Sequence, residues 1–347
     1  MNGPILPKGI ALLGLVVFIG LAWLLSSDRR RFPWRVVFGG LILQFVLAAL
    51  VLLTPQGRAF FEAANRAVEG FQTFVLAGSR FVFGISDSAA ESVGQNQDFF
   101  LLPFAFGVLP TVIVFSSLMA VLYYLGIMQV IVKAVAVVMQ RTLGTSGPET
   151  LAAAANIFVG HTEAPLVIRP YLDRLSRSEL NALMVGGFAT VTGSLLVVYA
   201  KAGAYLGDLI TASVISGPAA LVIAKVMEPE ARDYQPDQSL RLGDEQRAPN
   251  LIGAAAQGAT DGMKLALNIA AMLIAFLALL AMADFLVGWV GTWFGLVDDA
   301  GRPLLTFTGI LSYAFAPLAW LLGIDSAETL EAGRLLGIKM VANEVVA

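Results

Sequence analysis

Apolar residues in this chain fall into blocks of about 20, separated by short polar segments. A helix of roughly 20 residues crosses the ~30 Å hydrocarbon core of a bilayer, so each block predicts a membrane span. Pro103 and Pro110 should bend the third block. The predicted spans cover residues 9–27, 36–54, 99–127, 179–200, 205–227 and 262–297.

Shorter patterns between the spans predict helices that do not cross. Residues 55–98 include "PQGRAFFEAANRAVEGF", where apolar and charged residues recur at helical spacing, which is typical of a short helix lying at the interface. Residues 128–141 are apolar but too short to span, so we expect an interfacial or half-crossing helix there. After the last span, the apolar segment 304–324 holds Pro317, and a final stretch begins at residue 325.

The distribution of basic residues predicts the topology. The loop "SDRRRFPWR" (27–35) is rich in arginine, and positive charge accumulates on the cytoplasmic side. A second basic cluster, "RPYLDRLSR", ends the segment 147–175. Both clusters stay inside only if this segment enters the membrane from the cytoplasm and returns, so we predict a re-entrant hairpin. The charged, proline-containing segment 228–250 is predicted to be a cytoplasmic loop.

Composition supports the same fold class. Of the 347 residues, 57% are hydrophobic and 14% charged, against about a quarter charged in soluble domains. We therefore predict an all-α polytopic membrane protein. The chain has no cysteine, which excludes disulfides and thiolate metal sites. It has one histidine, whereas a zinc protease of the His-Glu-x-x-His kind needs two, so we expect no enzyme.

Two stretches of the chain resemble each other. "PETLAAAANIFVGHTEA" begins at Pro148 and "AETLEAGRLLGIKMVANEVVA" at Ala327, and each leads from Glu-Thr-Leu to a Thr-Glu or Asn-Glu pair. A shared tripeptide can arise by chance, but inverted repeats are a common transporter plan. We therefore expect an inverted-repeat transporter with two re-entrant helical hairpins and interfacial helices.

That plan predicts four parts. They are two spans with an interfacial helix (1–98), a first repeat with its hairpin at about 147–175 (99–227), the cytoplasmic loop (228–250), and the start of a second repeat whose hairpin is cut short (251–347).

The predicted hairpin tip, "NIFVGHTEAP" (156–165), is unusually polar. Ionisable groups inside a bilayer are tolerated where protein or a water-filled cavity surrounds them. Glu163, with Thr162 and His161 beside it, offers donors and acceptors that suit a polar, hydrogen-bonding solute. Glu344 repeats the arrangement beside Asn343. The alternative is that both glutamates are protonated packing residues.

A cation site is also suggested. Asn156 lies one helical turn before Gly160, and "ATVTGSLL" places Thr190, Thr192 and Ser194 around a glycine in the middle of a span. An amide oxygen, a hydroxyl and freed main-chain carbonyls form an all-oxygen cage of the kind that holds Na⁺ at half-helix ends. Alternatively, the hydroxyls bond only their own backbone.

The chain resembles the concentrative nucleoside transporter family, in its bacterial sodium-coupled form. The resemblance rests on "GHTEAPLVIRPYLDRLSRSEL", "GGFATVTGS", "GATDGMKLALN", "FAPLAWLLGI" and "AGRLLGIKMVANEVVA", which occur in family order over almost the whole chain. It implies a homotrimer in the bacterial inner membrane that imports nucleosides of the uridine, adenosine and cytidine class, with Na⁺ or H⁺ as the coupling ion. It implies no nucleic-acid partner.

The resemblance also implies roles for particular residues. The nucleobase would bind to His161, Thr162, Glu163 and Leu195, and the ribose to Glu344. The Na⁺ ligands would be Asn156, Val159, Thr190 and Val191, with the two valines acting through their carbonyls.

This chain departs from the family pattern in two places. His161 stands where the family usually has Gln, and an imidazole can change its charge near physiological pH, which leaves base preference and pH response open. The chain stops at Ala347, whereas the family continues with the rest of the hairpin and two further transmembrane helices, so we expect a truncated second repeat. A cation-coupled carrier for another small polar solute stays open as the alternative function.

Overall fold

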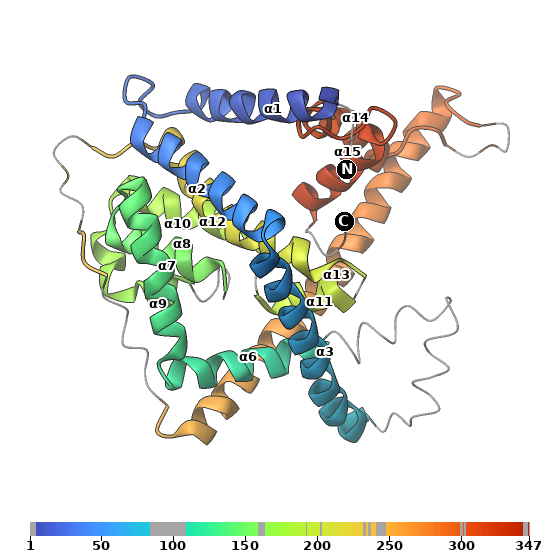
Figure 1. The fold of residues 1–347 in the computed structure, drawn as a ribbon. Coiled ribbons are helices and arrows are strands. Elements are labelled where there is room, and N and C mark those ends of the chain that lie inside the picture. Colours follow the sequence, from blue (N-terminus) through green and yellow to red (C-terminus); the bar gives the residue numbers. More distant parts are fainter. Residues whose placement is uncertain are drawn as a thin grey trace. The chain divides into compact units, whose positions relative to one another are not determined.

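The fold was established from a computed structural model, which forms two compact units described separately below. The larger unit is Ala22–Ala266, and the smaller combines Met1–Leu21 with Leu267–Ala347. Figure 1 follows the chain through its helices. The structure describes residues 5–83, 109–158, 164–191, 193–201, 203–231, 234, 237–240, 248–298, 301, 303–342 and 346.

Within the described ranges the regular elements are helices. Those of the larger unit are α2 (Trp34–Leu53), α3 (Pro55–Phe83), α6 (Leu109–Tyr124), α7 (Ile127–Leu143), α8 (Gly147–Asn156), α9 (Ala164–Val167), the 3₁₀ turn η2 (Arg169–Arg174), α10 (Arg177–Ala189), α11 (Gly193–Lys201) and α12 (Leu206–Met227). The smaller unit has α14 (Phe307–Leu321), α15 (Thr329–Val341) and most of α1 (Ile5–Leu24), while α13 (Leu251–Trp293) begins in the larger unit and ends in the smaller.

Three described helices are long and apolar enough to cross a membrane, namely α2, α12 and α13. A fourth span is possible by length and composition if α6 and α7, which meet at an angle of 81°, count as one broken span. The bend falls at Gly126, whose φ of 80° is left-handed and is readily adopted by glycine. The part Gly9–Leu24 of α1 and the helix α14 are apolar but shorter, so the structure confirms a helical chain with several hydrophobic spans.

Helix α8 forms the centre of the larger unit. All of its residues are buried, and most of its side chains are small because four alanines follow Leu151. Small side chains let α7, α10 and α12 pack closely around it, and α2 lies against α7 and α12 (Figure 1). A ten-residue helix that starts and ends inside protein is the first arm of the predicted hairpin. The chain returns from the hairpin through α9 and η2.

The predicted and observed helices differ in three places. The predicted single span over 179–200 is broken into α10 and α11, which are separated by residues 190–192. The span expected at 262–297 starts earlier, at Leu251, and forms one continuous helix of 43 residues, α13. The amphipathic helix expected to be short extends over 29 residues as α3. Of the two predicted bends, Pro103 lies outside the described residues, while Pro110 is a buried residue in the first turn of α6.

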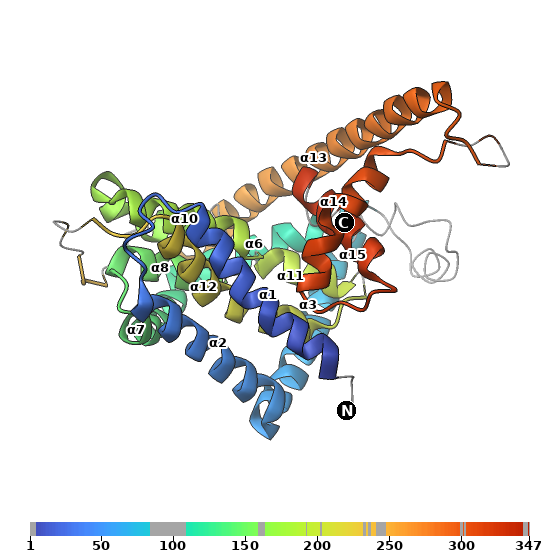
Figure 2. The same cartoon turned by 90° about the horizontal axis from the view of Figure 1, so that it is seen from above.

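In the smaller unit α14 and α15 pack side by side (Figure 2). The Ser312 hydroxyl of α14 donates a hydrogen bond to the Leu330 carbonyl of α15. Asp284 of α13 accepts a bond of 2.8 Å from the Thr308 amide, at the start of α14. A carboxylate at this position satisfies a free N–H and complements the helix dipole, so it fixes where α14 begins.

Candidate functional site

Two helix breaks meet in the larger unit. Helix α8 ends at Asn156, and α10 ends at Ala189 before α11 starts at Gly193. The Gly193 amide donates a hydrogen bond of 3.2 Å to the Phe158 carbonyl, which joins the second break to the first. A Cβ atom added to Gly193 would lie 2.3 Å from that oxygen, so the close approach requires glycine.

Among the residues that the structure describes at this junction, the Asn156 side chain is buried without a hydrogen-bond partner. The residue is 1% exposed, and both its amide oxygen and its amide nitrogen are buried with no hydrogen bond to protein. The amide lies against α10, because a Cβ atom added to Gly186 would be 3.0 Å from Nδ2. An unpaired buried amide costs about 1–3 kcal/mol, which a bound ligand can offset.

Thr190 directly follows the last residue of α10, on the other helix break of the junction. It is 8% exposed, and its hydroxyl donates a bond of 2.7 Å to the Gly186 carbonyl one turn earlier. The hydroxyl therefore bonds its own backbone, while its oxygen lone pairs remain available to a cation. The backbone after Ala189 is extended, which ends the helix and leaves main-chain carbonyls of the last turn without helical partners.

The polarity of the junction favours a cation. The carboxyl ends of α8 and α10 both lie here, and each carries a partial negative charge from its unpaired carbonyls. The oxygen atoms are neutral amide, hydroxyl and main-chain groups. Such a donor set suits a hard monovalent cation better than a transition metal. The described residues contain no group of three or more histidine, cysteine or acidic side chains that could hold another kind of metal ion.

The structure brings together part of the predicted site. Asn156 and Thr190 both lie beside Gly186, and Val191 follows in the break with a half-buried side chain. Leu195 lies half-buried in α11, in the first turn after Gly193. The remaining predicted site residues lie outside the described residues; they are Val159, His161, Thr162, Glu163 and Glu344.

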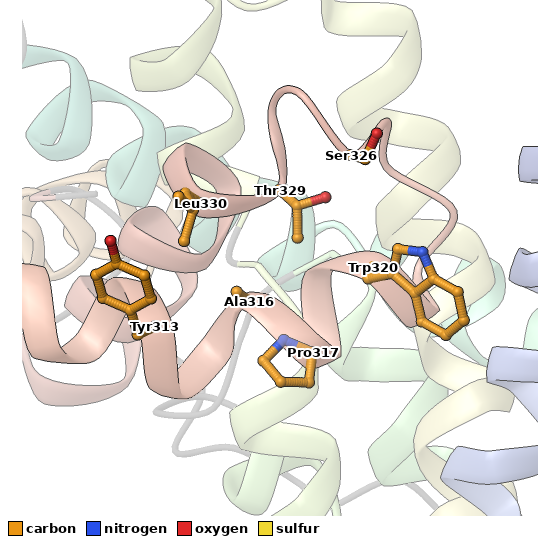
Figure 3. A pocket seen from close by; sticks show the side chains of 7 residues that line it. All are labelled: Tyr313, Ala316, Pro317, Trp320, Ser326, Thr329 and Leu330. Carbon is orange, nitrogen blue, oxygen red and sulfur yellow. The ribbon is translucent and has the colours of Figure 1, made fainter.

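The smaller unit has a groove of ≈ 350 Å³ between α14 and α15 (Figure 3). Tyr313, Pro317 and Trp320 line one side, and the Thr329 hydroxyl already donates to the Asp325 carbonyl. The groove is mostly apolar and is lined by no charged side chain. It therefore lacks the groups that would recognise a polar solute, and we do not place a binding site in it.

Family models match most of the chain. The N-terminal model of the Na⁺ dependent nucleoside transporters covers residues 13–86, the C-terminal model covers 208–347, and a nucleoside recognition model called Gate covers 105–206. The chain belongs to the Na⁺-dependent nucleoside transporter family.

Individual relatives agree with this assignment. This transporter is 43% identical to an uncharacterized transporter of Haemophilus influenzae over 97% of its own length and 78% of that protein. It is 41% identical to the sodium/nucleoside cotransporter 1 of Mus musculus, and spans about half of that longer chain.

The solved structure of CNTnw in an inward-facing, substrate-bound state matches 98% of this chain and 78% of that one, with a TM-score of 0.86 and 42% identity. A CNTnw variant in an outward-facing state matches with a TM-score of 0.88 and 42% identity. The predicted all-helical transporter fold is therefore confirmed.

Sequence reasoning missed a buried ionic cluster in this transporter. Lys225, near the end of α12, is 5% exposed, and its Nζ lies 2.6 Å from Glu149 Oε2 and 2.7 Å from Glu230 Oε2. The same ammonium donates to the Ser178 hydroxyl at 2.9 Å. Glu149 also accepts from the Ser146 amide at the start of α8. The cluster thus ties the first hairpin arm to α10 and α12.

The segment after α12 fastens the same hairpin from outside. The Asp237 carbonyl accepts from the Gly147 amide at 2.7 Å, and the Tyr171 hydroxyl lies 2.9 Å from the Ser239 hydroxyl. One contact holds the start of the hairpin and the other its return arm. These two contacts could hardly be predicted from the sequence, because the composition of a charged loop does not show which of its carbonyls and hydroxyls will bond to the hairpin.

Proposed function

We propose that this transporter imports nucleosides together with Na⁺ across the bacterial inner membrane, as a homotrimer. The observation that carries the proposal is the buried, unpartnered amide of Asn156 at the meeting point of two helix carboxyl ends. A cation at that point would receive the amide oxygen and the partial negative charge of both helices. Membership of the Na⁺-dependent family supports Na⁺ over H⁺ as the coupling ion.

The proposed Na⁺ ligands are the side chains of Asn156 and Thr190 and the carbonyls of Val159 and Val191. The described part of this set supports it in one respect. The carbonyls of Ile157 and Phe158, which come directly after Asn156, already accept hydrogen bonds from Ser213 and Gly193. These two carbonyls are thus already engaged, which favours a ligand other than Ile157 or Phe158.

The proposed substrate site adjoins the cation. His161, Thr162 and Glu163 would bind the nucleobase by hydrogen bonds, with Leu195 against its face, and Glu344 would bind the ribose hydroxyls. Because Asn156 and the tip share one short segment, a cation that orders the end of α8 also orders the residues that meet the base. Na⁺ would thereby raise nucleoside affinity, and nucleoside would raise Na⁺ affinity by the same factor.

Uptake into proteoliposomes tests this function. Radiolabelled uridine, adenosine and cytidine should accumulate when Na⁺ is higher outside, and nucleobases or amino acids should not compete. Glu163→Gln should abolish uptake, because it replaces one of the two acceptor oxygens with an N–H donor and removes the negative charge, while the assembled trimer stays intact. Accumulation of an unrelated polar solute, with no uptake of nucleosides, would favour the alternative carrier.

A further inference from the structure

Helix α12 contacts the end of α8 through a small polar side chain. Ser213, which is 3% exposed, donates a hydrogen bond of 2.9 Å from its hydroxyl to the carbonyl oxygen of Ile157. Ile157 directly follows Asn156, so this bond reaches the junction from an element that contributes none of the proposed ligands. The side chain of Ile157 packs on Gly217, one turn further along α12, where an added Cβ would approach within 3.1 Å.

The Ser213 bond satisfies one of the backbone carbonyls that the end of α8 leaves without a helical partner. A helix leaves its last four carbonyls without helical partners, and buried ones need another donor. Around the end of α8, the Ala155 carbonyl accepts from the Phe158 amide, the Phe158 carbonyl from Gly193, and the Ile157 carbonyl from Ser213. Of these three donors, two are main-chain amides and Ser213 alone donates from its side chain. Without it, the peptide group between residues 157 and 158 keeps the bond from its N–H to the Ala155 carbonyl but loses the one at its oxygen, so its plane is held less firmly.

That plane matters for the cation. Its orientation sets both the position of Asn156, one peptide group earlier, and the direction in which the chain leaves α8 toward the hairpin tip. The Ser213 bond also occupies a carbonyl that could otherwise turn toward the cation and change the number of ligands. A cation site is sensitive to such groups, because partners behind the ligands hold them in position.

We propose that Ser213 is a positioning residue for the cation site, which holds the Ile157 carbonyl so that Asn156 and the main chain after α8 face the cation. This inference rests on the proposed function, since it assumes that the junction binds Na⁺. Ser213 touches neither ion nor nucleoside. Its loss therefore weakens Na⁺ binding while the nucleoside site stays intact.

The test compares Ser213→Ala with Ser216→Ala in the complete gene product, reconstituted in proteoliposomes. Ser216 is a matched control because its hydroxyl bonds within α12, at 2.8 Å from the Ser213 carbonyl. Loss of one buried hydrogen bond predicts about a fivefold to tenfold rise in the Na⁺ concentration that gives half-maximal uridine uptake. The uridine KM at saturating Na⁺ should match that of the unchanged protein, and Ser216→Ala should be unaltered throughout.

Further variants separate positioning from general damage. Ser213→Thr keeps the hydroxyl and should restore most of the Na⁺ affinity. If Ser213→Ala fails to assemble, Ser213→Cys, a weaker donor, should show the same rise. Equal Na⁺ dependence in Ser213→Ala and Ser216→Ala would overturn the inference, as would a higher uridine KM that persists at saturating Na⁺. Absence of any Na⁺ dependence in the unchanged protein would instead contradict the proposed function itself.

Discussion

The amide of Gly193 donates a hydrogen bond to the carbonyl of Phe158, and this contact joins the break after α8 to the break between α10 and α11. Neither break alone makes an ion site. Together they place an unpartnered amide, a hydroxyl and two negative helix ends at one buried point. Under the proposed function, transport depends on how closely these two interrupted helices approach, and several consequences can be measured.

Gly193→Ala should separate the two breaks. The added Cβ would lie 2.3 Å from the Phe158 carbonyl oxygen and 2.9 Å from the ring of Phe115, so the backbone must move. We expect at least a tenfold loss of Na⁺-driven uridine uptake. Gly70→Ala is the control, because nothing lies within 4 Å of its added Cβ. Equal uptake by both variants would show that the close approach is not required.

Asn156→Leu should have opposite effects with and without Na⁺. In the absence of Na⁺ it removes a buried, unpaired amide and should leave the melting temperature in detergent unchanged or raise it, since that amide costs about 1–3 kcal/mol. Added Na⁺ should raise the melting temperature of the unchanged protein but not of the variant. Na⁺-dependent stabilisation that persists in Asn156→Leu would place the cation elsewhere.

Lys225→Met should destabilise the hairpin without touching the transport site. It leaves the buried carboxylate of Glu149 without its cation, which costs about 3–5 kcal/mol for a buried pair. A lower melting temperature in detergent should accompany an unchanged Na⁺ dependence of whatever uptake remains. Adding Glu149→Gln should recover part of the loss, because the uncompensated charge is then removed. Full stability of Lys225→Met alone would contradict this role.

Tyr234 should contribute stability that does not vary with pH in the ordinary range. Partial burial and the bond of 2.7 Å that its hydroxyl donates to Glu179 raise the pKa of Tyr234 above its usual value. A raised pKa means that folding favours the protonated phenol, so the contribution is complete below about pH 10 and is lost as pH rises through the raised value.

Tyr234→Phe should therefore lower the free energy of unfolding by about 1.5–3 kcal/mol, the range for a hydrogen bond to a charged group. The loss should be constant between about pH 6 and pH 9. Exposed Tyr205 offers the control, since Tyr205→Phe should change nothing. A loss from Tyr234→Phe that appears only at alkaline pH would have the wrong sign.

The sequence predicted the membrane helices because hydropathy is a local property. Residues 34–53 and 206–227 were identified within one or two residues, and the small-residue arm ending at Asn156 was recognised as part of a hairpin. The helix break at Thr190 was not predicted. The mean hydropathy over a window of about twenty residues stays high across "ATVTGSLL", so the segment looks like part of one continuous span. Its residues were nevertheless singled out as oxygen donors.

The ionic cluster could not be predicted for a different reason. By sequence alone, Lys225 is a basic residue at the end of a predicted span, which normally indicates a cytoplasmic, solvated charge. Its partner Glu149 is distant in sequence, and only packing of α8 against α12 brings the two together. The roles of His161, Thr162, Glu163 and Glu344, and the four-part division of the chain, stay predictions.

The most direct test of the central claim measures the ion itself. Proteoliposomes with equal Na⁺ on both sides receive external uridine, and entry of radioactive Na⁺ is followed with the unchanged protein and with Asn156→Leu. We predict uridine-dependent Na⁺ entry in the first case and none in the second. Uridine uptake without Na⁺ entry, or equal entry in both proteins, would contradict a coupling cation at the junction of α8 and α10.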